Sequence, residues 1–219
     1  MIKKIKYLFY LIVFIGFSSA NAGSYEDFFI AIKQDNARVI QELIFRGFDP
    51  NTPNPDGYYG LMLAIKEPSP RVAEALVAAP ETRVEVRNAS DESPLMLASL
   101  KGFRKLCELL IARDADVNKP GWTPLHYAAT GGHTEVVQLL LDNHAYVDAA
   151  SPNGSTPLMM AAMYGSPAAV QLLLDAGADP ALKNDLGLTA IDFARQGLKR
   201  DSAEIIATHI RRRSSTGAW

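Results

Sequence analysis

Apolar and polar positions along this chain repeat with a period near 33 residues. The segment Thr-Pro-Leu-His-Tyr-Ala-Ala at residues 123–129 returns as Thr-Pro-Leu-Met-Met-Ala-Ala at residues 156–162, which begins 33 positions later. Because a sequence repeat of this period indicates a repeated structural unit, weaker copies upstream and downstream extend the same register. Six repeats are predicted, and they start near Glu26, Tyr59, Ser93, Thr123, Thr156 and Thr189.

Each repeat is predicted to form two helices followed by a turn. In the best-preserved copies a Ser or Thr hydroxyl can cap the first helix, and the Pro that follows it suits the first helical position. In the fourth repeat the second helix, from Thr134 to about Asn143, has more apolar residues than an isolated helix pair can shield from water. The helices are therefore expected to stack on neighbouring repeats, and the turn formers at residues 151–154 predict a finger beside them.

The repeats resemble the ankyrin repeat family. Residues 123–126 match its Thr-Pro-Leu-His motif, Gly132 and His133 continue its consensus, and residues 177–179 stand where the family has Gly-Ala-Asp. The resemblance covers roughly residues 25–210. It implies an all-α repeat solenoid of helix-turn-helix units with β-hairpin fingers and degenerate terminal caps. It also implies a module that binds other proteins along its fingers and the exposed faces of its first helices.

The N-terminal segment indicates export. Three lysines precede an apolar run at residues 7–17, and the small residues Ala20 and Ala22 follow it. This order is typical of a signal peptide, and the run is shorter than the roughly 20 residues that a membrane-spanning helix needs. Residues 1–22 are predicted to be removed by cleavage after Ala22 or Ala20, which places the mature protein in the bacterial periplasm or outside the cell, with no membrane contact. A retained anchor is the alternative.

Removal of this segment changes the charge of the chain. The full sequence has 22 basic and 24 acidic side chains, and residues 1–22 hold three of the lysines and no acid, so the mature net charge is 22 − 3 − 24 = −5. Nucleic acid is not an expected partner, because its backbone attracts positively charged surfaces. One elongated domain is predicted over residues 23–210, followed by a flexible C-terminal tail at residues 211–219.

No catalytic residue, metal site or cofactor is predicted. The family resemblance gives His126 and His133 hydrogen-bonding roles within and between repeats, and the histidines lack the paired spacing of a helical metal site. Cys107 aligns with Val137 of the next repeat, so it is expected in the core as a small hydrophobic residue. Neither a nucleophile elbow nor a glycine-rich phosphate loop is present.

Aromatic and methionine side chains concentrate in the central repeats and form the candidate partner surface. Trp and Tyr bury a large area at modest entropic cost and are frequent interface anchors. A packing role is the alternative, because a Trp before Thr-Pro-Leu-His recurs in the family as a packing residue and Met159 is also a candidate for the core. The predicted partner-binding residues are Trp122, Tyr127, Met159, Met163, Tyr164, Tyr58 and Asn153.

One finger is shorter than the others. Only Lys119-Pro120-Gly121-Trp122 separates Asn118 from Thr123, three residues fewer than the equivalent stretch before Thr156. A short finger between two long ones predicts a notch with Trp122 at its base. The alternative is a neutral deletion, which loops tolerate readily.

These features favour a noncatalytic scaffold that acts as a monomer and binds another protein in the bacterial periplasm through its concave and finger surfaces. An enzyme would need an active site, which neither the repeats nor the tail supply. The alternative function is that of a secreted effector or toxin-neutralising protein that acts on a host or a competitor.

Overall fold

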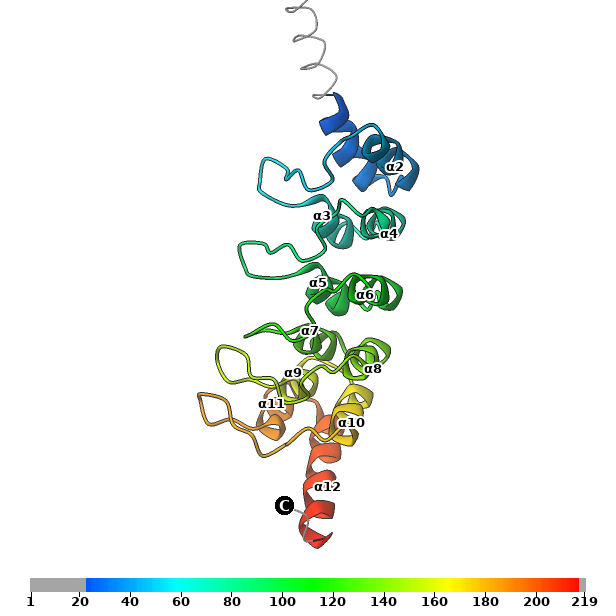
Figure 1. Ribbon diagram of the computed structural model, residues 1–219. Helices are drawn as coiled ribbons and strands as arrows, with labels where there is room; N and C mark the ends of the chain where they lie inside the picture. Colours follow the sequence, from blue (N-terminus) through cyan, green and yellow to red (C-terminus); the bar gives the residue numbers. More distant parts are fainter. Residues whose placement is uncertain (1–22, 217–219) are drawn as a thin grey trace, which may run out of the picture. The chain divides into compact units, whose positions relative to one another are not determined.

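The computed structural model describes residues 23–216 (Figure 1), so the predicted signal segment at residues 1–22 lies outside the described part of the chain. The chain divides into two compact units, unit 1 up to Arg83 and unit 2 from Val84. The single domain that the sequence predicts over residues 23–210 stays a prediction, because compact units of a repeat stack need not be separate domains. Repeats in a linear stack share no common core, since each one contacts only its neighbours, and no break in the sequence pattern marks this boundary.

Unit 1 contains two helix pairs, a helix over residues 23–33 with α2 (Ala37–Phe45), and α3 (Gly60–Lys66) with α4 (Pro70–Ala78). Ser69 joins the two pairs, because its hydroxyl donates a 2.7 Å hydrogen bond to the carbonyl oxygen of Ile32. Asp35 adds a second link through a 2.9 Å bond from the backbone N–H of Val72. The largest fully buried side chains of this unit are Phe28, Ile32, Ile40, Leu61, Met62, Ile65 and Leu76.

Unit 2 contains four helix pairs, α5 (Pro94–Lys101) with α6 (Arg104–Ile111), α7 (Pro124–Gly131) with α8 (Thr134–Asp142), α9 (Pro157–Met163) with α10 (Pro167–Asp175), and α11 (Ala190–Gln196) with α12 (Arg200–Thr216). The first helices α5, α7, α9 and α11 pack side by side in that order (Figure 1). Small residues permit this close approach. A Cβ at Gly165 would lie 2.3 Å from the carbonyl oxygen of Ala129, so only glycine fits where the loop after α9 meets α7.

The first helices begin at the positions that the repeat spacing indicates. Ser93, Thr123 and Thr156 are the N-cap residues of α5, α7 and α9, and each side chain accepts a hydrogen bond from the backbone N–H three residues later. Thr189 is the N-cap of α11, whereas Tyr59 caps α3 without a side-chain hydrogen bond. The remaining anchor, Glu26, lies inside the helix over residues 23–33. The all-helical repeat architecture is thus confirmed, with the start of the first repeat less sharply defined.

The fingers close as turns, and the described residues contain no paired strands, only an isolated antiparallel bridge between Pro53 and Tyr59. In three fingers an Asn side-chain oxygen accepts a hydrogen bond from the backbone N–H four residues later. The acceptor and donor residues are Asn54 and Tyr58 (2.8 Å), Asn88 and Glu92 (2.9 Å), and Asn184 and Leu188 (2.9 Å). The same oxygens also accept the N–H two residues later, at 2.9–3.1 Å, which makes an Asx turn in each finger and satisfies the loop backbone locally. The β-hairpin fingers predicted from the family resemblance are therefore reduced to single turns.

The last helix is longer than the sequence pattern suggests. α12 continues to Thr216, so residues 211–216 are helical where a tail is predicted from residue 211. Arg211, Arg212 and Arg213 are good helix formers, and no glycine or proline interrupts the segment before Gly217. The structure thus continues the last helix into residues 211–216, which the sequence analysis assigns to the tail.

Cys107 lies in the core of unit 2, fully buried on α6. Burial raises the pKa of its thiol to about 12, while a contact with Ser99 acts in the opposite direction. A thiol with this pKa stays protonated near neutral pH and is a poor nucleophile. The residue thus packs as the small hydrophobic group that its alignment with Val137 predicts.

Candidate protein-binding surfaces

The aromatic residues at the start of α7 pack mainly against the protein itself. The Trp122 ring is half-buried and meets the His126 ring edge-on, with centroids 5.2 Å apart. The half-buried Tyr127 donates a 2.9 Å hydrogen bond from its hydroxyl to Glu92 Oε1. Burial is the main cause that raises the pKa of the Tyr127 phenol, and the Glu92 carboxylate raises it further. For Trp122, these contacts fit the packing alternative.

Met159 is buried, with 1 % of its surface exposed. Its sulfur lies 3.4 Å from the backbone nitrogen of Thr156 and accepts that N–H, as Met96 does for Ser93. Met159 therefore helps to cap α9 from the inside and has no surface to offer a partner in this conformation. The prediction that it contacts a partner does not fit this position, because residue 3 of the first helix points into the core.

Met163 and Tyr164 lie at the C-terminal end of α9 and do present surface. Tyr164 is 54 % exposed, and Met163 beside it is half-buried. Asn153 is exposed at a fingertip, but its side-chain oxygen is used by the hydroxyl of Ser151 and the N–H of Ser155. Of the central residues predicted from sequence, Met163 and Tyr164 are thus the pair that the structure brings together with accessible side chains.

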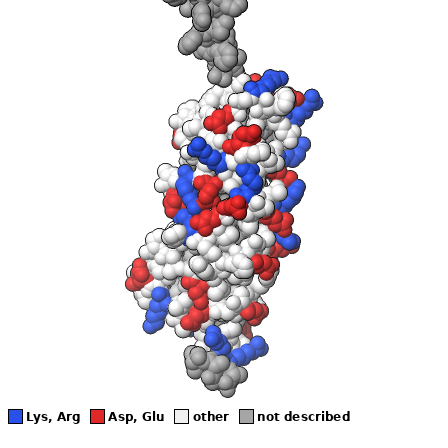
Figure 2. Space-filling view, viewed as in Figure 1, with Lys and Arg blue, Asp and Glu red and all other residues white. Residues whose placement is uncertain are grey.

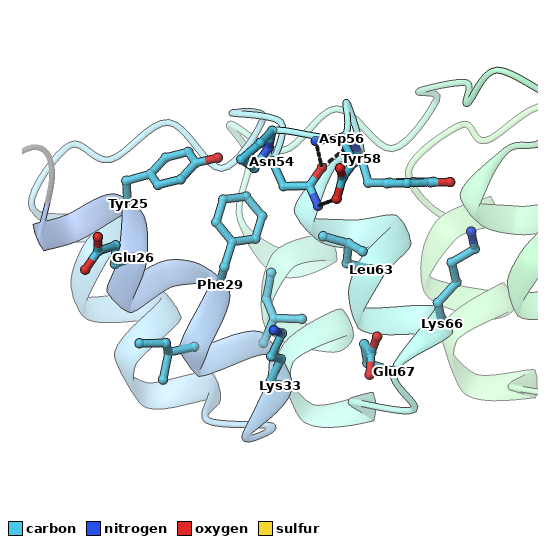
Figure 3. Close-up of a pocket in the computed structure, with 13 residues that line it drawn as sticks. Tyr25, Glu26, Phe29, Lys33, Asn54, Asp56, Tyr58, Leu63, Lys66 and Glu67 are labelled. Atoms are coloured by element: carbon cyan, nitrogen blue, oxygen red, sulfur yellow. Dashed lines mark hydrogen bonds between the residues drawn. The ribbon is translucent and has the colours of Figure 1, made fainter.

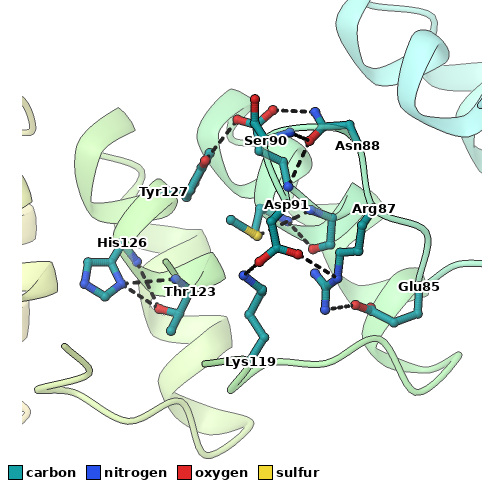
Figure 4. A network of polar contacts seen from close by, with 12 residues as sticks. Glu85, Arg87, Asn88, Ser90, Asp91, Lys119, Thr123, His126 and Tyr127 are labelled. Carbon is teal, nitrogen blue, oxygen red and sulfur yellow. Dashed lines mark hydrogen bonds and ion pairs between the residues drawn. The ribbon is translucent and has the colours of Figure 1, made fainter. Parts of the chain in front are cut away.

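The space beside the short finger is partly filled. Lys119 is almost fully buried, and its ammonium group contacts the Asp91 carboxylate of the preceding finger (Figure 4). On the other side, a Cβ added at Gly121 would lie 3.5 Å from the Pro152 side chain of the following finger. The four residues between Asn118 and Thr123 therefore bridge the two neighbouring fingers, so the predicted notch is not an empty gap.

Charged groups near Lys119 pair with one another, although the Nη1 atom of Arg87 is buried without a hydrogen-bond partner among the described residues. Arg87 contacts the Glu85 carboxylate and lies 4.0 Å from Asp91, while Asn88 donates a 2.6 Å hydrogen bond to Glu92. The Lys119 hydrogen bond holds the pKa of Asp91 below its usual value. Elsewhere on the face shown in Figure 2, acidic and basic side chains are interspersed and neither sign forms a continuous patch. This network is best explained as a structural clamp on the finger.

Unit 1 has a groove that the sequence analysis missed. It has a volume of about 630 Å³ and lies between the helix over residues 23–33, the finger before α3 and α3 itself (Figure 3). Of the residues predicted from sequence, only Tyr58 belongs to it. Its walls are aromatic and aliphatic and its rim is charged. The residues that line it include Tyr25, Phe29, Ile30, Leu63, Glu26, Asp56, Lys33, Lys66 and Glu67.

Hydrogen bonds and ring contacts fix the groove walls. The Tyr25 hydroxyl donates a 3.2 Å hydrogen bond to the carbonyl oxygen of Pro53, which ties the first helix to the finger. The Tyr25 and Phe29 rings meet edge to face, with centroids 4.9 Å apart. Ile30 is 50 % exposed. The apolar run Phe28-Phe29-Ile30 in the worn first repeat was the sequence signal that could have located this surface.

Within residues 23–216, no three His, Cys, Asp or Glu side chains come together in a way that could hold a metal ion. The helices described here include none with the length and apolar character needed to cross a membrane.

Comparisons with known proteins agree with this architecture. A family model described as ankyrin repeats in three copies matches residues 28–120 and again residues 113–184, which together exceed half of the 219 residues. A crystal structure of an ankyrin repeat domain from Acinetobacter baumannii AYE superposes with a TM-score of 0.71 at 25% identity, and the match covers 83% of this chain and 96% of that one.

Curated relatives match through their repeats over part of their length. The putative palmitoyltransferase ZDHHC13 of Danio rerio is 30% identical over 131 residues, 57% of this chain and 20% of the relative. The B-cell lymphoma 3 protein homolog of Mus musculus is 31% identical over 164 residues, 72% of this chain and 37% of the relative. The chain thus spans well under half of the length of these two proteins.

Proposed function

The chain belongs to the ankyrin repeat family, and on this basis we propose that it is a noncatalytic scaffold that binds another protein. Repeat stacks of this kind present extended surfaces for partners. The observation that supports binding most directly is the pair Met163 and Tyr164 on α9, where a 54 % exposed tyrosine lies beside a half-buried methionine. Tyrosines in such surroundings are frequent interface anchors.

Tyr164 provides the test of this proposal. A partner is first captured from the envelope fraction by cross-linking, and its affinity is then measured for variants by isothermal titration calorimetry. Tyr164→Ala is expected to weaken binding by about 30-fold, which corresponds to a hot-spot loss of about 2 kcal/mol. Tyr146→Ala is the matched control, because this tyrosine is 68 % exposed and lies in the loop after the second helix α8. Equal affinities of the two variants would remove Tyr164 from the interface.

We further propose that the protein is exported and works as a monomer in the bacterial periplasm. Support comes from the order of lysines, apolar run and small residues in the first 22 positions. N-terminal sequencing of protein recovered from periplasmic extract is expected to begin at Gly23 or, after cleavage at Ala20, at Asn21. Recovery from the membrane fraction with Met1 retained would indicate an anchor instead.

A secreted effector or toxin-neutralising protein remains the second candidate. The same stacked repeats would serve that function, so the binding surface does not separate the two. Gene neighbourhood does: cotranscription with an envelope enzyme favours the periplasmic scaffold, whereas a surrounding secretion or toxin cluster favours the effector.

A further inference from the structure

We propose that the groove of unit 1 receives an arginine or lysine side chain of a partner protein, an inference that rests on the protein-binding function proposed above. The groove has a volume of about 630 Å³, within the range of roughly 300–1,000 Å³ that is usual for ligand pockets. This is enough for an extended basic side chain with part of its backbone.

The aromatic walls can bind a cation. Tyr25 and Phe29 come from successive turns of the first helix, and Figure 3 shows their side chains directed toward the finger. Both rings are half-buried and held by neighbours, Tyr25 through its bond to Pro53 and Phe29 through its edge-to-face contact with Phe28 at 5.1 Å. A cation within about 6 Å of such a ring is attracted by its quadrupole. Fixed rings lose little entropy when a partner binds.

The groove already holds one cation of its own. The ammonium group of Lys66 lies 4.5 Å from the centroid of the Tyr58 ring (Figure 3). This contact occupies the Tyr58 side of the groove and demonstrates that an aromatic wall there can accommodate a positive charge. Tyr25 and Phe29 line the other part of the groove and are half-buried, so part of each ring is accessible to a charge from outside.

The rim charges favour a positive ligand in that part. In Figure 3 the Glu26 carboxylate lies near the Tyr25 ring, and Asp56 lies beyond Asn54, between the Phe29 ring and Tyr58. Lys33, Lys66 and Glu67 lie toward the C-terminal ends of the two helices. Among the described residues neither Glu26 nor Asp56 forms an ion pair, although Asn54 reaches Asp56 with a 3.5 Å hydrogen bond. Two carboxylates without an ion pair on the rim of an aromatic groove complement a cation and repel an acidic side chain.

Arginine is the better fit of the two basic residues. Its planar guanidinium can stack on a ring and still donate paired hydrogen bonds to a carboxylate, whereas an ammonium group acts as a point charge. The hydrocarbon stem of either side chain can lie along Leu63 and Ile30, which line the groove. A basic side chain therefore matches both the apolar depth and the acidic end of the site.

The test uses the full chain and three capped tripeptides that differ at the central position: acetyl-Leu-Arg-Leu-amide, acetyl-Leu-Gln-Leu-amide and acetyl-Leu-Glu-Leu-amide. Binding is followed by nuclear magnetic resonance shifts of the amides in unit 1. The arginine peptide is expected to shift residues of the groove and to bind at least ten-fold more tightly than the glutamine peptide, with weakening as salt rises. Equal binding of all three peptides, or no shift with about 1 mM arginine peptide, would overturn the proposal.

Variants at the rim and wall locate the effect. The double variant Glu26→Gln with Asp56→Asn is expected to weaken arginine-peptide binding about ten-fold, and Phe29→Leu, which keeps an apolar wall without a ring, about five-fold. The double variant Glu81→Gln with Glu135→Gln is the control for net charge, because both glutamates are exposed and neither lines the groove. Unchanged binding in the double variant rejects this site. If a captured partner still depends on Tyr164 in that case, the scaffold function stands without the groove.

Discussion

Replacing Leu140 by alanine is expected to lower the free energy of unfolding of unit 2 by about 2–5 kcal/mol. Leu140 lies on α8 in an interior repeat and has no exposed surface. Truncation loses the burial of the side chain and leaves a cavity, and α8 packs against both α6 and α10, so two inter-repeat contacts weaken together. Urea unfolding followed by tryptophan fluorescence measures the effect, because both tryptophans of the chain follow residue 84.

Leu186→Ala is the matched control for this prediction. The same chemical change is made in unit 2, but Leu186 is 81 % exposed on the finger before α11. The unfolding free energy of this variant is expected to stay within about 0.5 kcal/mol of the wild type. Similar losses in both variants would mean that burial in α8 does not govern the stability of unit 2.

The helical architecture was predictable from sequence because its signals are local. A Thr or Ser followed by Pro sets the start of a helix regardless of what packs on it, and Thr123 and Thr156 cap helices as expected. The stacking of these helices follows from their apolar faces. By contrast, the division at residues 83 and 84 depends on how contacts are distributed over the whole chain, which a repeating local pattern does not encode.

The candidate site was harder to predict, because the exposure of a side chain depends on the neighbouring repeat. Met159 and Met163 are both methionines on α9, yet the first is buried and the second half-buried. Residue type alone does not separate them. The groove of unit 1 was missed because its residues come from a worn repeat, a finger and a second helix, which the fold brings together over about 40 positions from Tyr25 to Glu67.

Acidification is expected to destabilise unit 2 through a single buried histidine. The ring of His126 is buried at the start of α7, between a contact with Thr123 and a 2.9 Å hydrogen bond from Nε2 to the carbonyl oxygen of Ser155. Burial lowers the pKa of His126 to about 4, although hydrogen bonds to backbone oxygens act to raise it. The folded protein therefore keeps this ring neutral where an unfolded chain would protonate it.

The direction of the effect follows from this pKa. Between pH 6.5 and about 4 the unfolded state binds a proton at His126 that the folded state does not, so stability falls as the pH is lowered through this window. A displacement of about 2.5 units at about 1.4 kcal/mol each gives a loss on the order of 3 kcal/mol by pH 4, of which about 2 kcal/mol has appeared by pH 5. Above pH 6.5 the contribution of this histidine to the pH dependence is expected to vanish.

The chain itself provides the variant that tests this effect. The equivalent position in two other repeats is methionine, and Met96 and Met159 both accept the N-cap N–H through sulfur at 3.4 Å. His126→Met should therefore fold with the same helix start, and the loss of the Ser155 hydrogen bond should lower its stability by a similar amount at every pH. Urea unfolding of both proteins from pH 7 to pH 4.5 is expected to give a slope in the wild type that is much smaller in the variant. Parallel pH profiles would show that other groups cause the acid sensitivity, because the substitution removes the proton-binding site while the repeat retains a capping group that its neighbours already use.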